Sequence, residues 1–286
     1  MSAKILDGKA LSRIVRDEVA QRVQELKSRG VQPRLDAIVA TTDPASLAYV
    51  AMKQKWCAEA GIVSESFPVD SNTSQNELLD KIAELNSNPE VHGVLLQHPL
   101  PKHLDEDAAL VALGPDKDAD GITSQSLGRL VSGLPGFRCA TPLGIMRLLA
   151  HHQIPLSGQH AVVIGRSVIL GKPAALMLLE ANATVTIAHS KTKDLPDLCR
   201  SADILVAAVG RAEMVQGDWL KPGCVVVDAG YNKVEGRKGD VGDVHYESAS
   251  AVADWITPVP GGVGPMTVAS LLSNAVDAAE RLHRPK

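Results

Sequence analysis

A tyrosine and a lysine near the start of the chain have the types and the spacing for chemistry on a flat substrate. Tyr49 and Lys53 occur in "DPASLAYVAMKQKWCAEAG", four residues apart, so a helix would place both on one face. An aromatic ring beside an amine could stack against a flat molecule and move a proton. Taken alone, such a pair is more often an aromatic residue at the edge of a core beside a lysine whose stem covers apolar surface.

Two further polar residues follow in the same half of the chain. Gln97 ends an apolar run in "LLQHPLP", and the prolines after it favour an extended exit, so its amide is expected at the carboxyl edge of a parallel sheet, where ligands bind. Asp120 in "DKDADG" could contact a ligand or simply form a turn before Gly121. Asp116 and Asp118 precede it with the alternation of a calcium loop, but the downstream glutamate is missing, so we expect no metal.

The segment "HAVVIGRSVILGKP" is typical of a nucleotide-binding turn between a strand and a helix. Gly165 permits the tight turn, and the free N–H groups of the following helix would attract phosphate oxygens. The usual fingerprint has glycines at positions one, three and six, whereas here Ser167 takes the third position and the last glycine comes one residue late. On these residues alone, an ordinary strand-to-helix turn is an equally good interpretation.

The next apolar run, "TVTIAHSKTK", favours one nucleotide over another. An NAD site would place an acid near its end to bind the ribose 2′-hydroxyl, and none is there. Ser190 offers a hydroxyl, Lys191 and Lys193 add positive charge, and Arg166 projects from the first turn, a set suited to a 2′-phosphate. The two lysines could instead be solvated loop charges. We therefore predict NADP as the cofactor.

A loop rich in glycine and proline precedes the last expected helix. "PVPGGVGPMT", residues 258–267, contains three glycines and three prolines, so its backbone could approach a ligand closely. It could return the chain to the first domain and line a cleft, or it could be only a stiff connection.

Helices and strands expected before residue 100 would hold the first group of residues at one sheet edge. Apolar residues follow helical spacing over residues 11–26, and "LDAIVATT" and "VHGVLLQ" are typical of buried strands. Between these strands we expect a helix over 43–61, opened by Asp43, and another whose capping box is formed by Ser74 and Glu77. This alternation predicts a parallel sheet with helical crossovers.

A second alternating series follows a looser segment. Residues 105–141 are interrupted by glycine, proline and charge, and we place the domain boundary there. Beyond it, short apolar runs predict strands near residues 161–164, 184–188, 204–208 and 225–228. A final helix is expected from Pro265 to about Leu282.

The sequence therefore predicts an α/β protein with two α/β domains flanking a cleft. Residues 1–138 would form the catalytic domain, joined by the C-terminal helix 265–286. Residues 139–264 would form a Rossmann-type NADP-binding domain with a parallel sheet, because a strand, a glycine turn, a helix and a strand make a mononucleotide-binding unit.

Composition excludes several classes of protein. The chain has 286 residues, 45% apolar and 22% charged, as in soluble globular proteins, and no apolar run could span a bilayer. A net charge of −4 and 3% aromatic residues argue against a nucleic-acid surface, so a small-molecule partner is expected. The first residues lack the features of a secretion signal, which favours the cytoplasm. Four widely spaced cysteines lack metal-ligand spacing, so we expect reduced thiols.

Six motifs in order make the chain resemble one family over nearly its whole length. They are "YVAMK", "LLQHPLP", "DKDADG", "TPLGIM", "GRSVILGKP" and "TPVPGGVGPMT". Together they are similar to the bifunctional methylenetetrahydrofolate dehydrogenase/methenyltetrahydrofolate cyclohydrolase family. The resemblance implies NADP-dependent oxidation of 5,10-methylenetetrahydrofolate to the methenyl cation and its hydrolysis to 10-formyltetrahydrofolate. It also implies a homodimer whose subunits bind folate between two α/β domains.

The resemblance assigns residues to the folate. Lys53 resembles the family's catalytic lysine, and Gln97 its hydrogen-bonding partner. Tyr49 resembles the ring that stacks on the folate, and Asp120 the carboxylate that anchors the pterin. The family's substrate loop is matched by Pro260, Gly261, Gly262, Val263, Gly264, Pro265, Met266, Thr267 and Val268.

Two positions depart from the family pattern. The NADP positions of the family are matched by Gly165, Arg166, Ser167 and Ser190. Tyr231 in "DAGYN" takes another cofactor-contact position, where isoleucine is expected. His98 stands where leucine is usual after the glutamine, and it could alter the environment of Lys53.

The implied chemistry agrees with these residue types. Hydride transfer mainly needs positioning, whereas hydrolysis needs an acid/base such as Lys53, with its pKa lowered by burial and a nearby cation. Two other functions stay open: a dehydrogenase with weak cyclohydrolase activity, for which His98 is the suspect feature, and a nucleotide-sensing protein that merely retains the fold. Against the second stands the presence of all four expected site residues, Tyr49, Lys53, Gln97 and Asp120.

Overall fold

The structure, a computed structural model, describes residues 2–40, 44–237 and 239–283, with the side chains of residues 44–49 outside that description. Contacts divide the chain into two compact units. Unit 1 consists of Met1–Arg13 and Thr141–Thr267, and unit 2 consists of Ile14–Ala140 and Val268–Lys286. Among the described helices, none is both long and apolar enough to cross a membrane.

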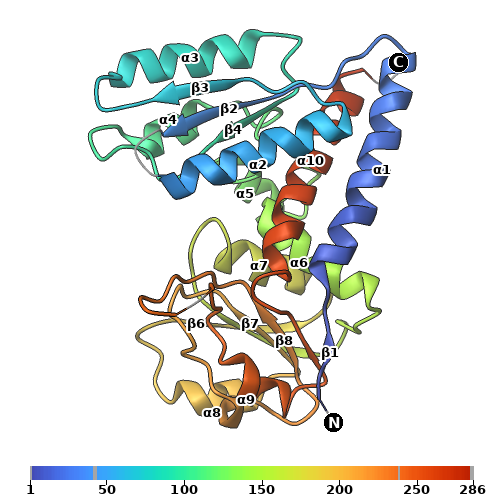
Figure 1. The fold of residues 1–286 in the computed structure, drawn as a ribbon, viewed down its shortest axis with the longest axis vertical. Helices are drawn as coiled ribbons and strands as arrows, with labels where there is room; N and C mark the ends of the chain where they lie inside the picture. The colour runs from blue at the N-terminus through green and yellow to red at the C-terminus, as the bar shows by residue number, and fades with distance from the viewer. Residues whose placement is uncertain (1, 41–43, 238, 284–286) are drawn as a thin grey trace. The chain divides into compact units, whose positions relative to one another are not determined.

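Unit 2 contains a parallel three-stranded sheet in the order β3-β2-β4 (Figure 1). Its strands are β2 (Leu35–Ala40), β3 (Ser66–Val69) and β4 (Gly93–Leu96). Every residue of β2 is buried, as expected for a central strand covered on both faces. The strands predicted at "LDAIVATT" and "VHGVLLQ" are confirmed. β3 is absent from the prediction because its four residues, "SFPV", carry too short a pattern.

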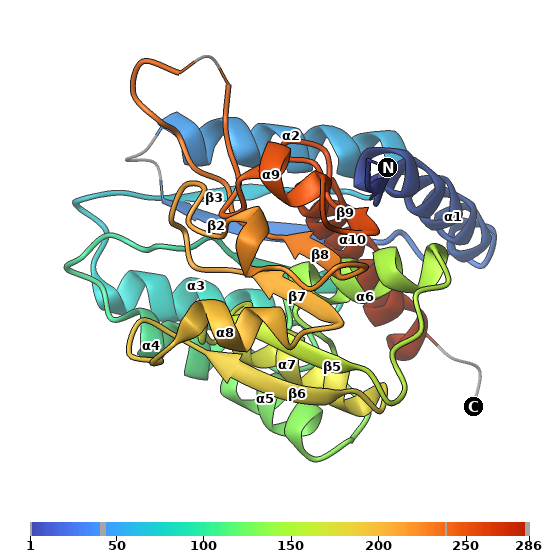
Figure 2. The same cartoon turned by 90° about the horizontal axis from the view of Figure 1, so that it is seen from below.

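Helices cover both faces of this sheet. α3 (Gln75–Ser87) and α4 (Glu106–Ala112) lie on one face and α2 (Pro44–Ala60) on the other, as Figure 2 shows. An apolar core on the α3 side includes Ile38, Leu78, Ile82, Val94 and Leu96. The helix expected over 43–61 is confirmed, while its expected N-cap, Asp43, lies outside the described residues. The unit also contains α5 (Ser124–Val131) and parts of α1 (Gly8–Ser28) and α10 (Val263–Leu282).

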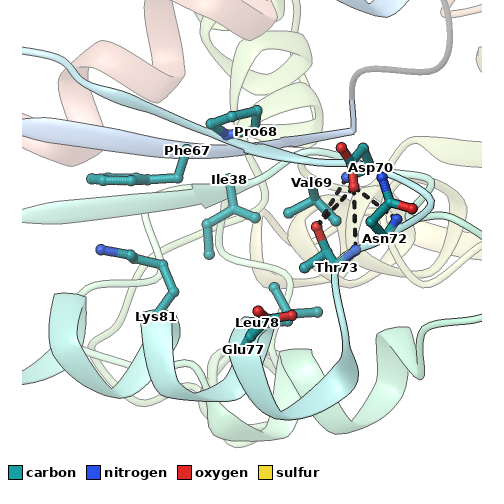
Figure 3. A pocket seen from close by; sticks show the side chains of 10 residues that line it. All are labelled: Ile38, Phe67, Pro68, Val69, Asp70, Asn72, Thr73, Glu77, Leu78 and Lys81. Carbon is teal, nitrogen blue, oxygen red and sulfur yellow. Dashed lines mark hydrogen bonds between the residues drawn. The ribbon is translucent and has the colours of Figure 1, made fainter.

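The turn from β3 into α3 fixes where that helix begins. The Asp70 carboxylate accepts the N–H of Asn72 at 2.8 Å and of Thr73 at 3.2 Å (Figure 3). Ser74 and Glu77 then form a reciprocal capping box, which confirms the predicted cap and satisfies N–H groups of the first turn. A pocket of about 360 Å³ lies between this turn, β3 and α3, and the carboxylates that line it already bind within the turn.

Unit 1 contains a parallel six-stranded sheet in the order β1-β9-β8-β7-β5-β6. Its strands are β1 (Lys4–Ile5), β5 (His160–Ile164), β6 (Thr184–Ala188), β7 (Ile204–Ala207), β8 (Val225–Asp228) and β9 (Trp255–Ile256). The four strands predicted in this half of the chain are confirmed. The strand order reverses beside β5, because β6 and β7 pair with its opposite edges. Open α/β sheets bind ligands at the carboxyl edge beside such a reversal.

The helices of unit 1 connect these strands. They are α6 (Ala140–His151), α7 (Gly171–Glu180), α8 (Leu195–Arg200), the short 3-10 helix η1 (Gly217–Trp219) and α9 (Tyr246–Ser250). α10 begins at Val263, two residues before the predicted start. Pro265 therefore stands in its first turn, where a residue without an N–H loses no intrahelical hydrogen bond.

The first thirteen residues fall in a different unit from the one expected. The prediction grouped them with residues 14–138, whereas contacts group them with unit 1. β1 pairs with β9, and the backbone N–H of Lys4 donates to the carbonyl of Asp254 at 2.7 Å. A two-residue strand has no alternation of apolar residues, and its partner lies near the other end of the chain, so local sequence patterns cannot predict this pairing.

Candidate active site and nucleotide pocket

Lys53 and Gln97 meet in unit 2. Lys53 lies on α2, and Gln97 directly follows β4, where its backbone N–H donates to the carbonyl of Ile38 at 2.9 Å. Lys53 Nζ donates a hydrogen bond of 3.1 Å to Gln97 Oε1. The lysine is only 8% exposed. The structure thus brings together the ammonium and carboxamide that the sequence predicts as partners, from segments 44 residues apart.

Burial controls the protonation of this lysine. Removal from water lowers the pKa of Lys53 to about 8, because the charged form loses solvation. The negative charge of Asp120 opposes this shift, as does the Cys57 thiol. The prediction that burial lowers the pKa agrees with the structure, but the neighbour expected to act with it was a cation, and Asp120 acts in the other direction.

Asp120 lies within electrostatic reach of Lys53, in a turn that another aspartate builds. The buried Asp118 carboxylate accepts the backbone N–H of Gly121 at 2.9 Å and of Thr123 at 2.8 Å. The turn is therefore held by Asp118, which leaves the partly buried carboxyl of Asp120 available for another role. Burial raises the pKa of Asp120, and the charge of Lys53 lowers it.

Tyr49 cannot be placed against these groups. Its backbone belongs to α2, four residues before Lys53, and its side chain lies outside the described residues. Its stacking role stays a prediction.

Unit 1 contains a pocket of about 540 Å³ at the carboxyl edge of β5, β6 and β7. Gly165 directly follows β5 and has a φ of +130°, and a Cβ there would lie 2.2 Å from the carbonyl oxygen of Ala208. Gly171, at the start of α7, is equally constrained, because its Cβ would lie 2.3 Å from the carbonyl oxygen of Gly165. Only glycine therefore fits at these two positions, because the turn packs closely against neighbouring backbone.

Most of the predicted cofactor residues line this pocket. They are Gly165, Arg166, Ser167 and Ser190, joined by His189, Thr192 and Arg211. Lys191 and Lys193 are exposed and are not among the lining residues, which agrees with their interpretation as solvated loop charges. No sequence motif marks Arg211, which follows β7. Its place in the same pocket as Arg166 becomes clear only from the strand order, in which β7 lies beside β5.

Tyr231 is not brought into this pocket. Its side chain is 63% exposed, and its hydroxyl donates to the Asp240 carboxylate. That hydrogen bond is the main reason why the pKa of Tyr231 is raised. The predicted cofactor contact of Tyr231 stays a prediction.

The glycine- and proline-rich loop packs closely within unit 1. The N–H of Gly262 donates to the carbonyl of Pro258 at 2.8 Å, and that of Lys9 donates to the carbonyl of Gly261 at 2.8 Å. The Met266 side chain is buried against Gly144 of α6. If this residue contacts a ligand, it must therefore do so through its backbone.

Comparisons with known proteins identify the family. Residues 6–120 match the tetrahydrofolate dehydrogenase/cyclohydrolase catalytic domain, and residues 139–283 match the NAD(P)-binding domain of the same family. The chain belongs to the tetrahydrofolate dehydrogenase/cyclohydrolase family.

Members of this family resemble the chain over its full length. The bifunctional protein FolD of Teredinibacter turnerae is 52% identical over 98% of this chain and 99% of that protein. The crystal structure of the bifunctional enzyme FolD from Campylobacter jejuni superposes with a TM-score of 0.96 at 46% identity, covering 98% of this chain and 99% of that one. The Trypanosoma brucei enzyme, solved with NADP and an inhibitor, has a TM-score of 0.94 at 35% identity and covers 100% of both chains.

Membership in the tetrahydrofolate dehydrogenase/cyclohydrolase family confirms the predicted α/β fold with a catalytic and an NAD(P)-binding domain. It also confirms the prediction of a bifunctional folate enzyme. The alternative of a nucleotide-sensing protein without catalysis gains no support from these relatives.

Proposed function

We propose that this enzyme oxidises 5,10-methylenetetrahydrofolate with NADP and hydrolyses the methenyl product at a site that includes Lys53, Gln97 and Asp120. The observation that carries this assignment is the 3.1 Å hydrogen bond from Lys53 Nζ to Gln97 Oε1 at a buried position. The amide is a neutral acceptor, so it holds the amine without a negative charge that would raise its pKa further. With a pKa of about 8, part of the lysine population is neutral near physiological pH.

Hydrolysis needs a base and then an acid at one position. As water adds its oxygen to the methenyl carbon, it loses a proton, which the neutral amine of Lys53 accepts. The bond from that carbon to N5 then breaks, and N5 takes the proton back from the lysine. The remaining proton of the water leaves to solvent as the formyl oxygen forms, so one proton is released per turnover.

The other predicted residues bind the folate. In this proposal Asp120 accepts hydrogen bonds from the N–H groups of the pterin, and Tyr49 stacks on the folate. The loop residues 260–268 contact the substrate through backbone groups. Positioning is the main requirement for the oxidation step, because hydride leaves the one-carbon bridge without bonding to any protein group.

The pocket in unit 1 suits NADP. Gly165 and Gly171 allow the turn after β5 to pack closely against neighbouring backbone, and this compact turn would present the first N–H groups of α7 to a pyrophosphate. Arg166, Arg211 and Ser190 supply the charge and the hydroxyl that a 2′-phosphate requires. When bound, the nicotinamide supplies the hydride acceptor. The Trypanosoma brucei relative solved with NADP supports the same choice.

The cofactor assignment predicts a measurable preference. With methylenetetrahydrofolate as substrate, we expect faster methenyl formation with NADP than with NAD. Arg211→Ala should raise the KM for NADP about ten-fold or more and leave the KM for NAD nearly unchanged, since a charge-assisted hydrogen bond contributes about 1.5–3 kcal/mol. Absorbance of the methenyl product measures the rate with each nucleotide and therefore both KM values. Equal KM values for NADP in the variant and the wild type would show that Arg211 does not bind the 2′-phosphate.

We also propose that the enzyme is a homodimer. Among the described residues, β6 is an edge strand that pairs with β5 alone. Ile187 on this strand is 43% exposed, and Leu179 on α7 is 57% exposed. Exposed edge strands are surfaces on which a second chain can pair, and a two-fold axis would make that pairing self-complementary. In a sedimentation experiment we expect the wild type to be a dimer and Ile187→Lys to be a monomer. If Ile187→Lys is still a dimer, this edge is not the interface.

The cysteines support a reducing compartment. All four cysteines are buried and none is in a disulfide. Free buried thiols are typical of proteins in a reducing compartment, which supports the cytoplasm as the site of the enzyme.

A further inference from the structure

We propose that His98 is a further substrate-binding residue, which accepts a hydrogen bond from the pterin of the folate, and that Glu106 fixes the imidazole in the form that can accept it. This inference rests on the proposed role of Asp120 as the pterin anchor.

The contacts of Glu106 determine which imidazole nitrogen carries the proton. Glu106 Oε1 lies 3.0 Å from His98 Nδ1, and Glu106 Oε2 accepts the backbone N–H of Leu100 at 2.8 Å. A carboxylate only accepts hydrogen bonds, so Nδ1 must be the donor. In the neutral ring this leaves Nε2 with a lone pair. The backbone of Leu100 holds Glu106 in place, so the tautomer of His98 is preset before a ligand arrives.

The second nitrogen has no partner in the described part of the chain. His98 Nε2 is buried and makes no hydrogen bond there. Leaving a buried polar atom unpaired costs about 1–3 kcal/mol, so such an atom is usually satisfied by a ligand or a water in the working protein. Nε2 is therefore an acceptor that the protein itself does not use.

The position of the ring connects it with the folate site. Gln97, which binds Lys53, directly precedes His98 and donates from Nε2 to the His98 carbonyl at 3.2 Å. The imidazole lies within electrostatic reach of the Asp120 carboxylate, because His98 in its protonated form lowers the pKa of Asp120. Two acceptors, a carboxylate and an imidazole nitrogen, thus occupy one region.

A pair of acceptors suits the aminopyrimidine edge of a reduced folate. The ring N–H and one amino hydrogen can donate to the two oxygens of Asp120, and the second amino hydrogen then needs an acceptor of its own. His98 Nε2 supplies that acceptor. We therefore expect His98 to increase affinity for the 2-amino group rather than to take part in proton transfer.

The test compares the KM for folate with the KM for NADP. His98→Leu should raise the KM for methylenetetrahydrofolate about ten-fold, with kcat and the KM for NADP changed less than two-fold. Glu106→Gln should act in the same direction, because its amide nitrogen would face Nδ1 and force the proton onto Nε2. His98→Gln should restore much of the affinity, since its amide offers a donor to Glu106 and an acceptor beside it. The matched control is His103→Leu, an exposed histidine of the same segment.

A folate that lacks the 2-amino group makes the test specific. The wild type should lose more affinity than His98→Leu when this analogue replaces the substrate, because only the wild type has both acceptors. Equal losses, or an unchanged KM for folate in His98→Leu, would overturn the role of His98. A fall in melting temperature with unchanged KM would assign the pair to stability alone, which also overturns it. Inactivity of the wild type on folate would instead contradict the proposed function.

Discussion

Replacing Lys53 with glutamine should abolish the hydrolysis of methenyltetrahydrofolate while leaving folate binding largely intact. Glutamine has a polar end that can reach Gln97, but it has no group that can accept and return a proton. General acid/base catalysis contributes about 10²–10⁴-fold to a rate, so we expect a loss of that size. The decay of methenyl absorbance measures hydrolysis directly, and binding of a folate inhibitor reports on the site.

The pH dependence gives this prediction a sharper form. The neutral amine is the base, so the wild-type hydrolysis rate should rise as pH increases through about 8, the pKa that burial gives Lys53. The hydrolysis rate of Lys53→Gln should not show this rise with pH. Lys55→Gln is the matched control, because Lys55 lies on the same helix with a side chain that is 72% exposed. A folded Lys53→Gln variant with wild-type hydrolysis would show that another group is the base.

Gly165→Ala should strongly weaken the oxidation activity through the loss of NADP affinity and spare the hydrolysis. The residue has a φ of +130°, and its new Cβ would lie 2.2 Å from the carbonyl oxygen of Ala208, so the turn must shift. Strained backbone of this kind costs about 1–3 kcal/mol, which corresponds to up to about 100-fold in affinity for NADP when the strain falls on the bound form. Hydrolysis of methenyltetrahydrofolate needs no nucleotide, and so it should persist.

A second glycine separates the two causes of this effect. Gly158 also has a positive φ, of +77°, but nothing lies within 4 Å of the position of its Cβ. Gly158→Ala should therefore cost only backbone strain and leave the KM for NADP unchanged. If Gly165→Ala binds NADP like the wild type, the proposal that this turn holds the pyrophosphate is wrong. If hydrolysis is lost as well, the substitution has damaged the whole fold, and circular dichroism will show it.

Local patterns determined most elements of the fold. The capping box of Ser74 and Glu77 is confirmed, because its hydrogen bonds join residues three apart and need no other part of the chain. The buried strands are confirmed because a short continuous apolar run in an α/β chain is typical of a strand covered on both faces of a parallel sheet. Short elements without periodicity, such as β1 and β3, were outside the reach of such patterns.

Local motifs mark the lysine and the glutamine of the candidate site, but they do not show that the two side chains are in contact. The 3.1 Å contact of Lys53 with Gln97 depends on α2 packing against a sheet in which β4 lies beside β2. The different roles of Asp118 and Asp120 also depend on the tertiary structure. The turn encloses the Asp118 carboxylate, which accepts backbone N–H groups of the turn. Arg211 joins Arg166 only because the strand order places β7 beside β5.

The sequence by itself determined the family, the element types and the residues able to do the chemistry, because these depend on residue type and short-range spacing. Only the tertiary structure decided which of those residues meet, that Glu106 binds His98, and that the lysine is buried enough for its pKa to fall to about 8. The physical reason is that burial, electrostatic reach and strand pairing depend on groups far apart in the chain. Local sequence patterns do not determine the distances between such groups.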